Sequence, residues 1–240
     1  MNKKTILKIW NLAVDLICPR KCPVCDEVVP TGAYCCMECR DTFHVIKEDF
    51  CMRCGKAIPA NMEYCKDCGN QSHLYIRGRV LYRYEGELKN SIYRFKYGHR
   101  VEYADFYAKQ TKEYLDEFIT QTNAQGLVPV PLHKKKQRQR GYNQAYKYAK
   151  ALSKEVGIPV YEDYVLRVKN TAPQKKFDAL GRQNNLKKAF KIGRNDVKLK
   201  IIILIDDIYT TGSTIDAVTK VLLEAGVDRV YFVALAGGIQ

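Results

Sequence analysis

The cysteines of this chain are confined to one short segment and recur with a fixed period. The chain has 240 residues and ten cysteines, and all ten lie between Cys18 and Cys68. Eight of them form C-x-x-C pairs, and residues 22–39 overlie residues 51–68 with a period of 29. The two units therefore comprise Cys22, Cys25, Cys36 and Cys39, and Cys51, Cys54, Cys65 and Cys68. Each unit can offer four thiolates in a tetrahedron, which predicts two closed, structural zinc sites.

Other uses of these thiols stay open at this point. The same cysteines could form disulfides or hold an iron–sulfur cluster, and the two zinc sites could be cross-braced between the units. The sequence shows no secretory signal, so an oxidising compartment is not indicated and disulfides are disfavoured. We expect a cytoplasmic protein that is not an integral membrane protein. Cys18 and Cys35 fall outside the matched pairs and are predicted to be unligated.

The turns after the cysteine pairs differ between the two units. Gly55 and Gly69 follow the pairs of the second unit, where a positive φ would suit a tight turn. The first unit has Asp26 and Arg40 at these positions, so its turns are expected to be less favourable. So short a segment cannot bury a large apolar core, and metal ligation would supply the missing stability.

A second informative segment runs from residue 200 to residue 226. Residues 201–205 are all apolar and mostly β-branched, as expected for a strand buried on both faces of a parallel sheet. We expect this strand to end at Asp206 and Asp207, and a helix to follow from about residue 214 and end at Gly226. Residues 230–235 form the next predicted strand. Ligands of such β-loop-α-β units bind at the carboxyl ends of the strands.

The loop between this strand and helix has the chemistry of an anion site. Successive N–H groups and hydroxyls from Thr210 to Thr214 open onto a helix N-terminus, which suits a phosphate monoester. Gly212 allows a close approach of the backbone, and the two aspartates could hold a diol, directly or through hydrated Mg²⁺. A sugar phosphate offers both groups. An ordinary helix cap with two solvated aspartates is the less favoured alternative.

These residues carry a resemblance to a known family. Residues 202–214 read Ile-Ile-Leu-Ile-Asp-Asp-Ile-Tyr-Thr-Thr-Gly-Ser-Thr, which resembles the phosphoribosyl pyrophosphate (PRPP) motif of type I phosphoribosyltransferases. With the cysteine module, the chain resembles the ComF family of competence-associated proteins over residues 20–240. Further support comes from residues 84–98, residues 128–132 with 140–144, and residues 174–190.

The resemblance implies a fold, a ligand and a set of site residues. The implied fold is α/β: a type I phosphoribosyltransferase-like parallel sheet flanked by helices, with a zinc-ribbon-like module before it. We place the module at residues 1–72 and the phosphoribosyltransferase-like domain at residues 73–240. The resemblance also implies Mg²⁺-dependent PRPP binding and a part in natural transformation. The candidate PRPP-binding residues are Asp206, Asp207, Tyr209, Thr210, Thr211, Gly212, Ser213 and Thr214, and the two aspartates are also the catalytic candidates.

The middle of the chain is strongly basic. Residues 71–200 contain 28 basic and 12 acidic residues, a net charge of +16, and residues 118–154 contain no acidic residue. The stretch before the predicted helix at 143–156 lacks apolar anchors, so we interpret it as a mobile loop. Such a loop could neutralise pyrophosphate, bind nucleic-acid phosphates, or be only a solvated face. The candidates for pyrophosphate or nucleic-acid contact are Lys134, Lys135, Lys136, Arg138, Arg140 and Tyr142.

Two amphipathic helices are expected before this basic stretch. Leu88, Ile92 and Phe95 lie on one helical face that Gly98 would end, so the aromatic residues of 93–97 are interpreted as core. Residues 105–119 form the next predicted helix, and the apolar residues of 6–17 form a short stripe that would pack on the protein.

Two functions follow from these observations. The first is a PRPP-binding protein that acts in DNA uptake, binds single-stranded DNA and contacts competence-machinery proteins through the zinc module. The alternative is an enzyme that displaces pyrophosphate from PRPP with a nitrogen nucleophile, which the sequence does not identify. Pyrophosphate release in the presence of PRPP, Mg²⁺ and a mixture of bases would separate the two.

Overall fold

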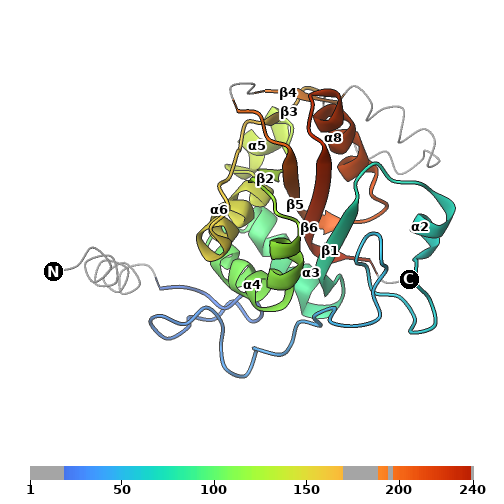
Figure 1. The fold of residues 1–240 in the computed structure, drawn as a ribbon. Coiled ribbons are helices and arrows are strands. Elements are labelled where there is room, and N and C mark those ends of the chain that lie inside the picture. Colours follow the sequence, from blue (N-terminus) through green and yellow to red (C-terminus); the bar gives the residue numbers. More distant parts are fainter. Residues whose placement is uncertain (1–18, 170–188, 194–196, 239–240) are drawn as a thin grey trace.

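The structure is a computed structural model that describes residues 19–169, 189–193 and 197–238 (Figure 1). Three sequence-based predictions fall outside these residues: the unligated Cys18, the N-terminal apolar stripe, and most of the ComF-like stretch at 174–190.

A parallel sheet of four strands forms the centre of the molecule. Its strand order is β1 (Arg77–Arg83), β6 (Arg229–Gly237), β5 (Ile201–Tyr209) and β2 (Gly126–Pro129). All neighbouring strands run parallel, as the apolar run at 201–205 predicts. A separate antiparallel pair joins β3 (Val165–Arg167) to β4 (Phe190–Ile192).

Strand β5 is longer than the sequence predicts. The prediction ended it at Asp206 and Asp207, but the strand continues to Tyr209. The reason is that β6 runs alongside and pairs Asp206 with Ala234 and Tyr209 with Gly237. Both aspartates are therefore held in a strand rather than in a loop.

Helices cover both faces of the sheet (Figure 1). The elements α3 (Gly86–Tyr97), α4 (Tyr103–Gln121) and α6 (Gln144–Val156) lie on one side, and α8 (Ser213–Glu224) lies on the other. The predicted helices at these places are confirmed, including the end of α3 at Gly98. A short helix α2 (Lys66–Asn70) follows the third cysteine of the second unit and contains Gly69, which therefore does not take the positive φ expected of it.

The predicted mobile loop at the start of the basic segment is wrong. Residues Lys134–Arg140 form a helix, α5, although no apolar stripe anchors it. Caps at both ends account for this helix. The His133 side chain accepts a hydrogen bond from the N–H of Lys135, and Gly141 ends the helix at a φ of 82°. Lys, Arg and Gln also have high intrinsic helix propensity.

The sheet separates two apolar cores. Ile203 and Ile205 of β5 point toward α3, α4 and α6, whereas Ile202 and Leu204 point toward α8. This alternation follows from the two-residue period of a strand, and it explains why the whole run is apolar.

Each cysteine unit extends a different one of these cores. Cys22, Val24 and Val29 of the first unit belong to the core beneath α3 and α4. Cys51, Ala57 and Ile58 of the second unit belong to the core beneath α8. Between them the chain hydrogen-bonds along the edge of β1, since the N–H of Ile46 donates to Leu81 O at 2.8 Å. The domain boundary at residue 72 stays a prediction, but the module and the sheet share their apolar interior.

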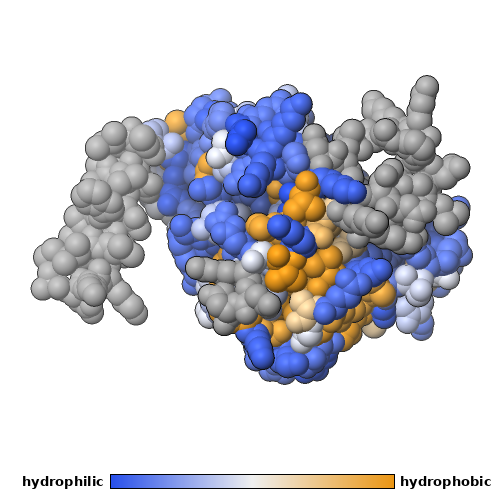
Figure 2. All heavy atoms as spheres, turned by 90° about the horizontal axis from the view of Figure 1, so that it is seen from above, coloured by the Kyte–Doolittle hydropathy of each residue, from blue (hydrophilic) through white to orange (hydrophobic). Residues whose placement is uncertain are grey.

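The surface seen from above is largely hydrophilic around a central hydrophobic patch (Figure 2). Within the described part of the chain, the helices include none that has the length and apolar character needed to cross a bilayer.

Candidate functional site

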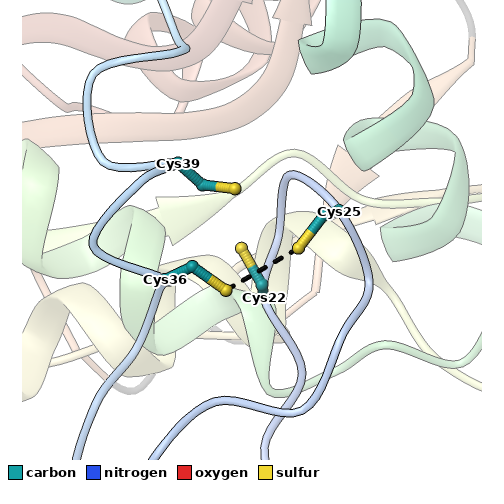
Figure 3. A group of neighbouring side chains, drawn as sticks. All are labelled: Cys22, Cys25, Cys36 and Cys39. Atoms are coloured by element: carbon teal, nitrogen blue, oxygen red, sulfur yellow. Dashed lines mark hydrogen bonds between the residues drawn. The ribbon is translucent and has the colours of Figure 1, made fainter.

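The first cysteine unit has the geometry of a metal site. The Sγ atoms of Cys22, Cys25, Cys36 and Cys39 all lie within 4.8 Å of one another, and Figure 3 shows the side chains directed toward a common centre. Cys25 Sγ lies 3.7 Å from Cys36 Sγ. A tetrahedron with Zn–S bonds of about 2.3 Å has edges of about 3.8 Å, so the spacing fits zinc.

The second unit has the same geometry and is more deeply buried. Cys51, Cys54, Cys65 and Cys68 also lie within 4.8 Å of one another, and the Sγ atoms of Cys54 and Cys65 are 3.6 Å apart. The cysteines therefore group within each unit, as the repeat predicts, and the cross-braced alternative is wrong. Four thiolates fill the coordination shell of zinc and leave no position for a reacting water, which makes both sites structural.

The 29-residue repeat also holds for the backbone. The N–H of Cys22 donates to Glu27 O at 2.8 Å, and the N–H of Cys51 donates to Lys56 O at the same distance. At the turn, Gly55 has a φ of 74° and the matching Asp26 has a φ of 63°. Asp26 is held there because Arg100 Nε and Tyr103 Oη donate to its carboxylate at 2.7 and 2.6 Å. These bonds hold the pKa of Asp26 at about 2.

Cys35 lies beside the first site without joining it. Its Sγ is 3.6 Å from that of Cys22, yet it is not one of the four sulfur atoms that converge. This position agrees with its prediction as an unligated residue.

The two aspartates of β5 differ in their surroundings. Asp207 is 5% exposed and forms an ion pair with Lys96 of α3, while Asp206 is partly exposed. Burial and the neighbouring Asp207 raise the pKa of Asp206 well above its usual range. Burial would also raise the pKa of Asp207, but the Lys96 ammonium outweighs it and lowers that pKa.

Lys96 pairs with Asp207, and Arg167, Arg140 and Lys136 lie near enough to influence one another or the carboxylates electrostatically. Burial, together with the nearby Arg167, Arg140 and Lys96, lowers the pKa of Lys136. Burial lowers the pKa of Arg167 on β3, and the nearby Asp206 carboxylate opposes this shift. Neighbouring like charges repel one another, and an anion bound among them would relieve that repulsion.

Helix α5 divides the predicted basic residues into two groups. Lys136 and Arg140, spaced four residues apart and therefore on one helical face, are partly buried. Lys134, Lys135 and Arg138 are exposed. The structure therefore does not bring all five cations to one place, and the two groups face different environments.

The loop after β5 has the form expected of an anion cradle. Gly212 has a φ of 82° and precedes the first turn of α8, and Thr211 Oγ1 and Ser213 Oγ lie 3.0 Å apart. A side chain at position 212 would be crowded, because a Cβ there would lie 2.6 Å from Tyr209 Oη. Thr210 is exposed, and Thr211, Ser213 and Thr214 are partly exposed, so their hydroxyls are accessible.

Two tyrosines among the predicted site residues lie in the core instead. Tyr209 is 1% exposed, stacks on Phe232 at 4.7 Å, and its hydroxyl is 2.7 Å from Tyr75 Oη. Tyr142 is 8% exposed and its hydroxyl donates to Phe95 O, so it cannot stack on a base. Tyr209 lies on a buried face of β5, and Tyr142, in the turn between α5 and α6, lies against Phe95 of α3.

The second cysteine unit contacts the loop directly. Lys56, which follows the Gly55 turn, is 3% exposed and donates from Nζ to Thr210 O at 3.1 Å and to Asp67 Oδ2 at 2.6 Å. Burial would lower the pKa of Lys56, but the Asp67 carboxylate raises it, so the side chain remains charged. His73 also pairs with Asp216 of α8 at 2.7 Å.

Sequence reasoning missed Lys56, Lys96 and Arg167. Lys56 is visible as a signal only in the comparison of the two units, where the first unit has Glu27 at the matching position. Lys96 lies in the aromatic stretch that suggested a core helix. Arg167 lies far from the motif in sequence, and no pattern links the two.

Two family models match the chain. A double zinc ribbon domain matches residues 13–69, and a phosphoribosyl transferase domain matches residues 141–240. Among solved structures, a hypoxanthine phosphoribosyltransferase from Staphylococcus aureus aligns over 57% of this chain and 64% of its own. Its sequence identity is 15% and its TM-score is 0.32, so the fold assignment rests on the family model and on the parallel sheet.

Curated relatives match over nearly the whole chain. The "DNA utilization protein YhgH" of Escherichia coli is 28% identical over 80% of this chain and 91% of its own length. The "Competence protein ComFC" of Bacillus subtilis is 30% identical over 80% of this chain and 78% of its own. The "Competence protein F" of Haemophilus influenzae is 30% identical over 84% of this chain and 96% of its own. This similarity, with a double zinc ribbon followed by a phosphoribosyltransferase domain, shows that the chain belongs to the ComF family of competence proteins.

Proposed function

We propose that this protein binds PRPP with Mg²⁺ beside Asp206, and that it binds single-stranded DNA on the exposed face of α5 as part of DNA uptake. The division of α5 carries this proposal. Its inner face adds Lys136 and Arg140 to an anion site that already has Lys96 and Arg167, while its outer face exposes three further cations.

The chemical groups of PRPP match the parts of the site. The loop from Thr210 to Thr214 would hold the 5′-phosphate, and Asp206 and Asp207 would accept hydrogen bonds from the ribose diol. The four cations would neutralise the pyrophosphate. Asp206 and Asp207 are oxygen ligands of the kind that Mg²⁺ accepts, and the ion would supply further positive charge for the pyrophosphate.

Calorimetry tests the ligand. We expect PRPP to bind measurably in the presence of Mg²⁺ and much more weakly without it. Ribose 5-phosphate is the matched ligand, since it has the phosphate and the diol but no pyrophosphate. It should bind more weakly than PRPP, and equal affinity for the two would contradict the role of the four cations.

Transfer of the ribosyl group to a nitrogen acceptor is a second candidate activity. The observation in its favour is that the same four cations lie where they could stabilise pyrophosphate as it leaves the anomeric carbon. Incubation with PRPP, Mg²⁺ and a mixture of nucleobases should then release pyrophosphate. Binding without release would leave PRPP as a bound ligand and not a substrate.

Single-stranded DNA should bind through the three exposed cations of α5. For single-stranded DNA, log K falls as log salt concentration rises, and each phosphate contact steepens this slope by about 0.7. Replacing Lys134, Lys135 and Arg138 with Gln should therefore flatten the salt slope by about 2 units, measured by fluorescence anisotropy. PRPP affinity should change little, because these side chains point away from the carboxylates. A loss of PRPP binding with normal DNA binding would reverse the assignment of the two faces.

Lys56 should act as a positioning residue for the phosphate loop. Lys56→Met removes the donor to Thr210 O, and we expect PRPP affinity to fall about tenfold, the equivalent of roughly 1.4 kcal/mol. Zinc content should remain at two ions per chain, since Lys56 is not a ligand. Lys220→Met is the matched control, because Lys220 is an exposed lysine on the helix that follows the same loop. If both variants weaken PRPP binding equally, Lys56 acts only through its positive charge and does not position the loop.

A further inference from the structure

Helix α3 presents an exposed pair of tyrosines beside the anion site. Tyr93 is 65% exposed and Tyr97 is 48% exposed, and their ring centroids are 5.0 Å apart. They lie four residues apart on the outer face, while Leu88, Ile92 and Phe95 are buried on the inner face. The sequence suggested that the aromatic residues of this stretch are core, and for these two rings the structure shows the opposite.

The tyrosine pair is joined to the basic helix by one arginine. Arg140, the last residue of α5, donates from Nη2 to Tyr97 Oη at 2.8 Å, and its guanidinium carbon lies 4.6 Å from the centroid of the same ring. Arg140 therefore links the exposed rings to α5, whose other face exposes Lys134, Lys135 and Arg138. A seven-residue helix is only about 10 Å long, so the two groups lie within reach of a few nucleotides.

We propose that Tyr93 and Tyr97 form a stacking platform for unpaired bases of single-stranded DNA, whose phosphates are bound by the outer face of α5. Leaving two large rings exposed side by side has no packing purpose. Aromatic rings beside a cationic track are the combination by which proteins bind single strands without sequence preference. The proposal rests on the proposed DNA-binding function and replaces Tyr142, which is buried, as the stacking residue.

A free nucleotide held near the PRPP site would offer the same two groups as a DNA strand, a base and a phosphate. The strand is favoured because Lys134, Lys135 and Arg138 extend the positive charge away from the carboxylates, farther than one nucleotide needs. Fluorescence anisotropy with an oligo(dT) of about 12 nucleotides, with dTMP as competitor, separates the two sources.

The test uses the full chain and a double variant, Tyr93→Ala with Tyr97→Ala. Affinity for the oligonucleotide should fall about 5- to 150-fold for each ring that stacks, and the salt slope should stay unchanged. The Phe double variant should retain most of the affinity, because it keeps the rings. Tyr64→Ala is the matched control, since Tyr64 is 48% exposed, the same as Tyr97, but lies on the second cysteine unit.

The outcomes distinguish this inference from the proposed function. If the Ala double variant binds oligo(dT) as the unmodified protein does, the platform is refuted while DNA binding stands. If the unmodified protein does not bind oligo(dT) at about 50 mM salt, the proposed DNA-binding function fails first. If dTMP displaces oligo(dT) when both are present at the same concentration of nucleotides, the assignment to a strand is overturned. Unchanged zinc content and circular dichroism would show that the variants are folded.

Discussion

Removal of zinc should cost this protein more stability than any single substitution. Structural zinc contributes on the order of 10 kcal/mol per site in isolated modules, whereas a whole domain is typically stable by only about 5–15 kcal/mol. Because each cysteine unit belongs to one of the two apolar cores, metal loss should loosen the sheet as well as the module. We expect two zinc ions per chain by elemental analysis, and a large fall in the thermal unfolding temperature after chelation.

The two zinc sites should differ in their effect on PRPP. Cys51→Ser with Cys54→Ser removes the site that holds Lys56, so PRPP affinity should fall together with stability. Cys22→Ser with Cys25→Ser loosens the first unit, which contacts α3 through hydrogen bonds from Arg94 to Pro23 O and Val24 O at 3.0 and 2.7 Å. PRPP affinity should fall less in that variant.

Cys35→Ser is the control for these thiol substitutions. Cys35 lies within 3.6 Å of a ligand but outside the group of four, so two zinc ions should remain. A drop to one zinc in this variant would show that Cys35, and not one of the four assigned cysteines, is a ligand of the first site. A protein that contains no zinc at all would contradict the module as described.

Loss of the two aspartates should have the largest effect on ligand affinity. Each carboxylate is expected to contribute a charge-assisted hydrogen bond of about 1.5–3 kcal/mol to PRPP, so Asp206→Asn with Asp207→Asn should weaken binding by several kcal/mol. Calorimetry with PRPP and Mg²⁺ measures this loss. Asp228→Asn is the control, because Asp228 is exposed and pairs only with the exposed Lys200 in the described part of the chain. Unchanged affinity in the double variant would remove the site assignment.

The two single variants should separate binding from folding. Asp207 is buried against Lys96, and removal of one partner of a buried ion pair costs about 3–5 kcal/mol of stability. Asp207→Asn should therefore lower the unfolding temperature, and Lys96→Met in the same chain should restore part of it. Asp206 is partly exposed, so Asp206→Asn should affect ligand binding with little change in stability.

Local patterns were sufficient for the elements whose signal is periodic. The 29-residue repeat placed the eight cysteines in the correct groups of four, and the turn at Gly55 followed from the same comparison. The apolar run at 201–205 identified a strand buried on both faces, and the helices with an apolar stripe were found where expected. In each case the information lies in a repeated or contiguous pattern of the sequence itself.

The same patterns failed at one strand and one helix, for different reasons. Strand β5 extends past Asp207 because β6, a distant partner in sequence, lies beside it. Helix α5 was missed although its caps, His133 and Gly141, are adjacent in sequence, because the run between them has no apolar face. Lys96 is a basic residue in an aromatic stretch, and only the packing of α3 against the sheet brings it to Asp207.

The sequence by itself determined the thiol sites, the anion-binding motif and the strong positive charge of the middle of the chain. The tertiary structure decided which charges and rings face the ligand site, which face solvent and which are buried. Tyr93, Tyr97 and Tyr142 show why, because the sequence assigned the first two to the core and the third to a binding surface, and the structure reverses both assignments. Tyr93 and Tyr97 lie on the face of α3 opposite its buried residues, whereas Tyr142 is held in the core by Phe95, and both outcomes depend on contacts between residues far apart in the chain.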